Sequence, residues 1–98
     1  MKDYPYLSEA VAAVLRHKRE ESGLSKRKLA ELADIERVYL IHLEKGEKRP
    51  TLNALFYLCD ALGLDPEEFV HLVREELKRR RERSPSEKSL GRDARKDG

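Results

Sequence analysis

The chain contains little that would support an extracellular, membrane or loop-rich protein. Its 98 residues include no tryptophan and one cysteine. A single cysteine excludes an internal disulfide framework and a cysteine-rich zinc site. No apolar run approaches the ~18 residues that span a bilayer, and the first residues lack the pattern of a signal peptide. Five glycines and four prolines are too few for a loop-rich β protein.

What is present is enough for one small, highly charged domain. Charged residues make up 41% of the chain, yet the formal net charge is only +2. The two signs are segregated: residues 26–49 hold seven basic and five acidic side chains, residues 50–77 one and six, and residues 78–98 nine and four. Such an asymmetry can orient a protein towards a polyanion even when the total charge is small.

The spacing of apolar residues predicts five helices and no strand. Residues of the types that begin and end helices flank each run, including Ser25 and Thr51 as N-caps and Gly63 as a stop. We expect the helices over residues 8–22, 26–33, 36–45, 52–62 and 66–83, with Ser8 capping the first. Residues 84–98 contain one leucine and no aromatic residue, so we expect a disordered basic tail. The expected fold is all-α, a compact five-helix bundle over residues 1–83.

The fourth and fifth helices carry more apolar residues than a small core needs. On the fourth we expect a buried side formed by Leu52, Leu55, Phe56, Leu58, Cys59 and Leu62. Tyr57 on its outer side, with a stripe on the fifth helix formed by Val70, Val73 and Leu77, predicts a homodimer interface. Dimerisation would place two equivalent surfaces about 34 Å apart, which is one turn of DNA.

The segment from Ser25 to Gly46 carries most of the functional information. Two short helices are joined by three or four residues, a spacing that makes the second cross the first and lie on the outside of the bundle. Ile35, Leu40 and Leu43 would dock this outer helix on the core, which leaves the rest of it exposed. A rigidly held, exposed helix is the shape that enters the major groove of DNA.

The same segment resembles the lambda-repressor/Cro-like helix-turn-helix family, also called the xenobiotic-response-element family. The resemblance covers residues 15–69, and its motifs are Gly23-Leu24-Ser25, Leu29-Ala30-Glu31, Tyr39-Leu40, Leu43-Glu44-Lys45-Gly46, Arg49-Pro50-Thr51 and Ala61-Leu62-Gly63-Leu64. It implies a sequence-specific, usually dimeric DNA-binding transcription regulator of bacterial, phage or plasmid origin, located in the cytoplasm. It also implies that Arg19 and Glu44 form a structural pair.

The residues expected to contact DNA lie on the second and third helices and in the following loop. By the resemblance, Arg37, Val38 and His42 read bases. Near the phosphate backbone it places Lys26, Tyr39, Lys45, Lys48 and Arg49. Ile41 can contact thymine methyl groups. The full set is Lys26, Arg37, Val38, Tyr39, Ile41, His42, Lys45, Lys48 and Arg49. Asp34 stands where the family's turn usually has glycine, and Glu36 replaces the usual Ser or Thr cap.

Each of these signals also has an interpretation without DNA. Residues 26–28 and 78–83 are also typical of solvated charged faces, and Val38 with Ile41 is compatible with a protein partner. The expected function is a dimeric repressor that binds a palindromic operator; the alternative is the antitoxin of a toxin–antitoxin pair, or a protein-binding adaptor.

His17 and His71 have no ligand-spaced partner, so we expect no metal or other cofactor. The chain offers no candidate nucleophile or phosphate loop, so we do not expect an enzyme.

Overall fold

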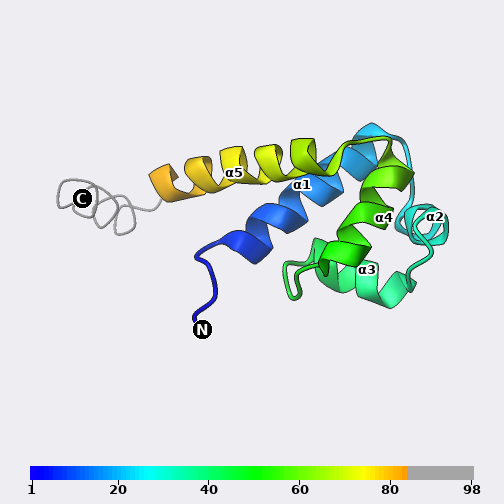
Figure 1. Ribbon diagram of the computed structural model, residues 1–98, viewed down its shortest axis with the longest axis horizontal. Coiled ribbons are helices and arrows are strands. Elements are labelled where there is room, and N and C mark those ends of the chain that lie inside the picture. Colours follow the sequence, from blue (N-terminus) through cyan, green and yellow to red (C-terminus); the bar gives the residue numbers. More distant parts are fainter. Residues whose placement is uncertain (84–98) are drawn as a thin grey trace.

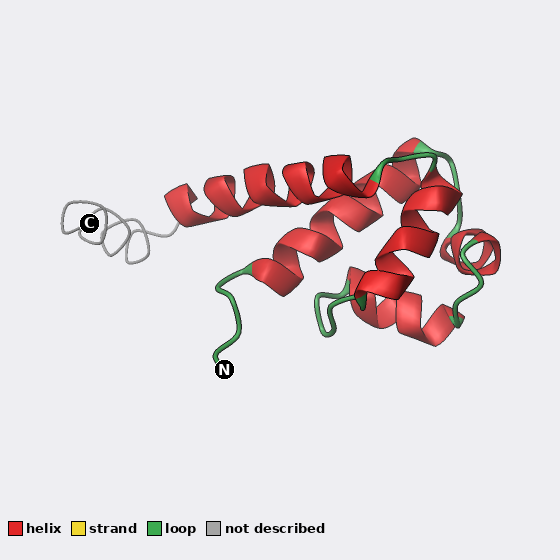
Figure 2. Cartoon of the chain, in the orientation of Figure 1, coloured by secondary structure: helices red, strands yellow, loops and turns green. Residues whose placement is uncertain are grey.

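The computed structural model describes residues 1–83, and within them the structure consists of five helices without strands (Figures 1 and 2). Every helix begins and ends within one residue of the expected position. The prediction of a disordered tail over residues 84–98 lies outside the described residues. The helices are α1 (Leu7–Glu21), α2 (Lys26–Leu32), α3 (Arg37–Glu44), α4 (Leu52–Leu62) and α5 (Pro66–Arg83).

The helices form two parts that share one core. The long helices α1 and α5 lie side by side, and α2, α3 and α4 gather at one end of them (Figure 1). Among residues 1–83, no helix combines the length and the apolar composition that crossing a bilayer requires. The largest side chains buried completely in the core are Phe69, Leu15, Leu29, Leu40, Leu43, Leu58 and Cys59.

Local structure explains where α2 and α4 begin and where α4 ends. The Ser25 hydroxyl accepts from the backbone N–H of Lys28 at 3.0 Å, and the Thr51 hydroxyl accepts from that of Ala54 at 3.0 Å. Both residues are therefore N-caps, as expected. Gly63 ends α4 in the left-handed conformation with a φ of 66°, which glycine adopts without steric cost.

The start of α1 differs from the expectation. Ser8 lies inside the helix, and the N-cap position is taken by Tyr6, whose φ is 64° and whose side chain makes no capping hydrogen bond. The Ser8 hydroxyl accepts instead from Nη1 of Arg49 at 3.1 Å. The prediction of a Ser8 cap was wrong because the helical hydrogen bonds begin before Ser8: the backbone N–H of Ala10 donates to the Tyr6 carbonyl at 2.9 Å.

Several apolar side chains of α4 and α5 are exposed rather than buried. Leu52 and Phe56 are 70% and 52% exposed, which corrects the prediction that both lie on the buried side of α4. On α5 only Val70 of the expected stripe is exposed, because Val73 and Leu77 belong to the core. Exposed apolar side chains are thus more numerous than expected on α4 and fewer than expected on α5.

Cys59 is confirmed as a core residue. Its side chain is fully buried on α4, and burial raises the pKa of its thiol to about 11. The thiolate that reacts with electrophiles and metals is therefore strongly disfavoured in the folded chain.

A buried ion pair connects α1 to α3. Nε and Nη2 of Arg19 donate to the two carboxylate oxygens of Glu44 at 2.7 and 3.0 Å, and Nη1 donates to the backbone carbonyl of Leu24 at 2.9 Å. Both charged residues are buried, and the hydrogen bond with Glu44 raises the pKa of Arg19 further above its ordinary value. The pairing expected of these residues is confirmed, and it fixes the end of α3 to the end of α1.

Removing one charge of this pair tests its role. We expect Glu44→Gln to lower the free energy of unfolding by about 3 kcal/mol, because it leaves the Arg19 charge buried without its counterion. Urea denaturation followed by circular dichroism measures the loss. The control is the double variant Arg19→Met with Glu44→Leu, which removes both charges and should lose much less stability. Equal losses in the single and double variants would contradict the argument.

Candidate nucleic-acid interface

The turn between α2 and α3 determines how α3 is presented. Asp34 adopts a φ of 55°, so the turn that usually has glycine in the family forms here with aspartate in the left-handed conformation. The backbone N–H of Asp34 donates to the Glu31 carbonyl at 3.2 Å, and that of Ile35 donates to the Ala30 carbonyl at 3.0 Å. Aspartate tolerates this conformation better than most residues, so the chain turns sharply from α2 into α3.

One side of α3 is fixed in the protein and the other faces outward. Leu40, Leu43 and Glu44 are buried against the core, while Arg37 is exposed and Val38 is 60% exposed. Ile41 and His42 are half-buried. At the N-cap position, Glu36 makes no side-chain capping bond, and its side chain is exposed.

His42 is bound to the loop that follows α3. Its Nδ1 lies 2.6 Å from Oε1 of Glu47, and both side chains are accessible to solvent. This hydrogen bond holds the pKa of the Glu47 carboxyl below its usual range. The imidazole is therefore oriented by an acidic group rather than free to rotate, which the sequence interpretation did not foresee.

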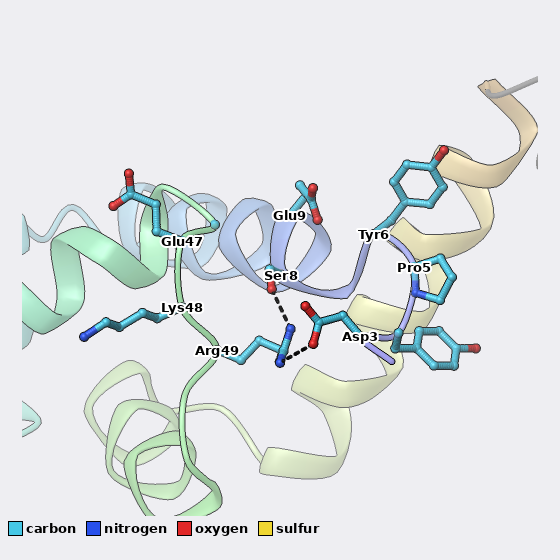
Figure 3. Close-up of a pocket in the computed structure, with 10 residues that line it drawn as sticks. Asp3, Pro5, Tyr6, Ser8, Glu9, Glu47, Lys48 and Arg49 are labelled. Atoms are coloured by element: carbon cyan, nitrogen blue, oxygen red, sulfur yellow. Dashed lines mark hydrogen bonds and ion pairs between the residues drawn. The ribbon is translucent and has the colours of Figure 1, made fainter. Parts of the chain in front are cut away.

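Two other candidate residues also have partners inside the chain. The Tyr39 hydroxyl accepts from the backbone N–H of Thr51 at 3.2 Å and so joins α3 to the start of α4. Arg49 donates from Nη2 to Oδ1 of Asp3 at 3.1 Å, in addition to its bond with Ser8 (Figure 3). These contacts bridge residues far apart in sequence, so no local pattern pointed to them.

The remaining basic candidates lie at the start of α2 and after α3. Lys45 and Lys48 are exposed, and Lys48 points away from the arginine beside it (Figure 3). Lys26 is half-buried in the first turn of α2, where Lys28 pairs with Glu31 at 3.6 Å. The turn and α3 thus bring Arg37, Val38, Ile41 and His42 onto one short helix, flanked by lysines at both ends of the segment.

The described part of the chain shows no alternative site of metal chemistry. Within residues 1–83, no three or more His, Cys, Asp or Glu side chains lie close enough together to hold a metal ion. His17 lies on the surface of α1, where Nε2 is 3.6 Å from the Glu21 carboxylate.

Comparisons with known proteins agree with this architecture. Residues 10–72 match the model of the helix-turn-helix domain family, and because the match spans more than half of the chain, the chain belongs to that family. Together with the fold, this match defines the class: the DNA-binding helix-turn-helix transcription regulators of the lambda-repressor-like kind. No curated protein matches the sequence significantly.

Solved structures of other proteins are similar to this chain in fold, and two of them also in sequence. The clp gene regulator ClgR from Corynebacterium glutamicum is 29% identical, with 92% of each chain covered and a TM-score of 0.74. The restriction-modification controller protein C.AhdI from Aeromonas hydrophila is 32% identical over 67% of this chain and 98% of its own, with a TM-score of 0.62. The controller protein C.Esp1396I, 22% identical over 76% of this chain and 95% of its own with a TM-score of 0.68, shows likeness of fold alone.

The contact between His42 and Glu47 predicts a measurable titration. We expect the pKa of the Glu47 carboxyl to rise towards its ordinary value in His42→Ala, because the hydrogen bond that favours the carboxylate is lost. Carbon-detected NMR titration of the glutamate carboxyls measures this change, with Glu21, whose pKa is lowered by its hydrogen bond with Lys18, as an internal control that should not move.

The sign of the effect on stability follows from this shift. Because the pKa of Glu47 is lower in the folded chain, the contact stabilises the fold above the unfolded pKa, and that stabilisation is lost as pH falls through the folded pKa. An unchanged Glu47 titration in the variant would contradict the assignment.

Proposed function

We propose that the protein is a sequence-specific, dimeric repressor that reads a palindromic operator in double-stranded DNA with α3. The observation that carries the proposal is the outward face of α3, where Arg37 and Val38 are exposed on a helix anchored through Glu44. Arginine can donate to O6 and N7 of guanine together, and valine can contact a thymine methyl group. Occupation of a promoter by such a protein would block polymerase.

Basic side chains around α3 would position the protein on the phosphate backbone. Lys26 at the start of α2, and Lys45 and Lys48 after α3, would supply positive charge, while Tyr39 on α3 and Arg49 in the following loop would add hydrogen bonds. Ile41 and His42 would lie at the edge of the base-reading group. The modest net charge favours recognition by this local face over bulk attraction.

A dimer is the form that a palindromic operator requires. The exposed apolar side chains Leu52 and Phe56, one turn apart on α4, and Val70 on α5 support a contact between two copies of the chain. Tyr57 is also exposed, but it lines a hollow with Glu36 and Tyr39 and so faces α3. We therefore assign the dimer contact to the first three residues.

A protein-binding role, as an antitoxin or an adaptor, is the second candidate. The exposure of Val38 favours it, because an apolar side chain that is 60% exposed on α3 would suit a protein surface as well as a thymine methyl group. The two roles differ in their response to salt. Binding dominated by phosphate contacts weakens steeply as salt rises, whereas an apolar protein contact does not.

Selection of bound duplexes from a random pool tests the proposed function. We expect one enriched palindromic sequence, bound with a log–log salt slope of several units. In Arg37→Ala, the loss of a guanine contact should cost about 1–3 kcal/mol and relax the base preference. In Lys26→Ala, affinity should fall about equally for all sequences, and the slope should decrease by about 1.

The control for this experiment is Arg74→Ala, which removes the same charge from an exposed position on α5. It should retain both the affinity and the base preference. Binding that does not depend on salt, or an absence of binding to every duplex in the pool, would refute the DNA-binding function.

The dimer contact is tested separately by charge insertion. We expect Phe56→Lys to be monomeric at concentrations where the unaltered chain is dimeric, because a lysine ammonium in an apolar contact must lose its hydration. Sedimentation velocity gives the two masses. Leu32→Lys is the matched control, since Leu32 on α2 is exposed to the same degree, 51% against 52% for Phe56. A dimer that survives Phe56→Lys would place the interface elsewhere.

A further inference from the structure

The residues before and at the start of α1 make an unexpected set of contacts with basic side chains. Nη2 and Nη1 of Arg49 donate to the Asp3 carboxylate and the Ser8 hydroxyl, both at 3.1 Å (Figure 3). Arg81 donates to the Tyr4 hydroxyl at 2.8 Å, and its guanidinium lies 5.3 Å from the centre of the tyrosine ring. We call residues 3–8 the N-terminal segment; it joins the loop after α3 to the end of α5.

The loop after α3 lies directly against this segment. Backbone atoms of Ser8 and Glu9 lie 3.6–3.7 Å from where a Cβ on Gly46 would stand, so the loop packs on the first turn of α1. Arg49 and Asp3 line the same hollow of about 420 Å³ between the loop and the N-terminal segment (Figure 3). Because Tyr4 is held by α5, the Asp3 carboxylate is kept within reach of Arg49 even though it lies near the beginning of the chain.

The contact between Asp3 and Arg49 is suited to exchange. The Asp3 side chain is 80% exposed and that of Arg49 is 41% exposed, so water and ions reach both groups. Exposed ion pairs of this kind are weak. A phosphate oxygen is an acceptor of the same charge type as a carboxylate oxygen, and arginine donates to both in the same geometry.

We propose, on the basis of the DNA-binding function proposed above, that Asp3 competes with DNA phosphate for Arg49. In the free protein the carboxylate holds the guanidinium, and on binding a phosphate takes its place. Lys48 needs no such exchange because its side chain extends away from Arg49 and Asp3 (Figure 3). The N-terminal segment therefore lowers the affinity for all duplexes about equally and leaves the base preference of α3 unchanged.

The inference is tested by removing the negative charge from Asp3. In Asp3→Asn, we expect the bound duplex, measured by fluorescence anisotropy, to be held about three- to fivefold more tightly. The log–log salt slope should steepen by up to about 0.9, because the contact between Arg49 and phosphate then forms without breaking an ion pair that salt also weakens. Glu67→Gln is the matched control: it removes the same charge from an exposed position in the first turn of α5, and its affinity should stay unchanged.

A double variant shows whether the effect acts through Arg49. Arg49→Gln should bind more weakly, and the addition of Asp3→Asn to Arg49→Gln should change nothing. If Asp3→Asn binds no more tightly than Glu67→Gln, or improves binding equally in the Arg49→Gln background, the competition does not exist. Circular dichroism melts check that all four variants remain folded.

A heparin column separates this inference from the proposed function. Heparin is a polyanion without base sequence, so it tests the release of Arg49 alone. If no duplex binds any variant, the DNA-binding function is wrong. Competition for an anionic ligand would still be supported if Asp3→Asn elutes later than Glu67→Gln and this difference disappears in the Arg49→Gln background. Equal elution of the two variants would overturn the inference.

Discussion

The orientation of α3 depends on the ion pair between Arg19 and Glu44. One guanidinium binds the last turn of α3 through two oxygens and the carbonyl of Leu24 through a third contact, so it fixes α1, the turn before α2 and α3 relative to one another. Burial of two charges adds little net stability, because their loss of hydration offsets their attraction. The main effect of the ion pair is to select one orientation of α3, since any packing of α3 that separated the pair would leave a charge buried without its partner.

The helices could be predicted from the sequence because local chemistry determines their limits. Ser25 and Thr51 cap α2 and α4 with their own hydroxyls, Gly63 supplies a left-handed stop, and Pro66 begins α5. The turn at Asp34 was also predictable from the tolerance of aspartate for positive φ. Where the limit of a helix has no such signal, as at Tyr6, the prediction assigned the cap to the nearest suitable residue and was wrong.

The exposure of apolar residues was less predictable. Leu52 and Phe56 are apolar and spaced like the buried residues of α4, and only the packing of α2 and α5 against α4 decides which side is covered. Within the candidate site, the positions on α3 followed from spacing. The partners of Tyr39 and Arg49 did not, because Thr51 and Asp3 lie 12 and 46 residues away in sequence and meet them only in the folded chain.

The far end of α5 shows how a helix can continue beyond its core. Leu77 is the last buried residue of α5, yet the helix continues to Arg83. Glu76 lies 2.8–3.6 Å from guanidinium nitrogens of three arginines in the last two turns, and Lys78 pairs with Glu75 at 3.2 Å. The pairs three or four residues apart each stabilise a helix by ~0.2–0.5 kcal/mol and weaken as salt rises. The stability of the last two turns of α5 therefore depends on ionic strength: concentrated salt should weaken them and leave the bundle intact.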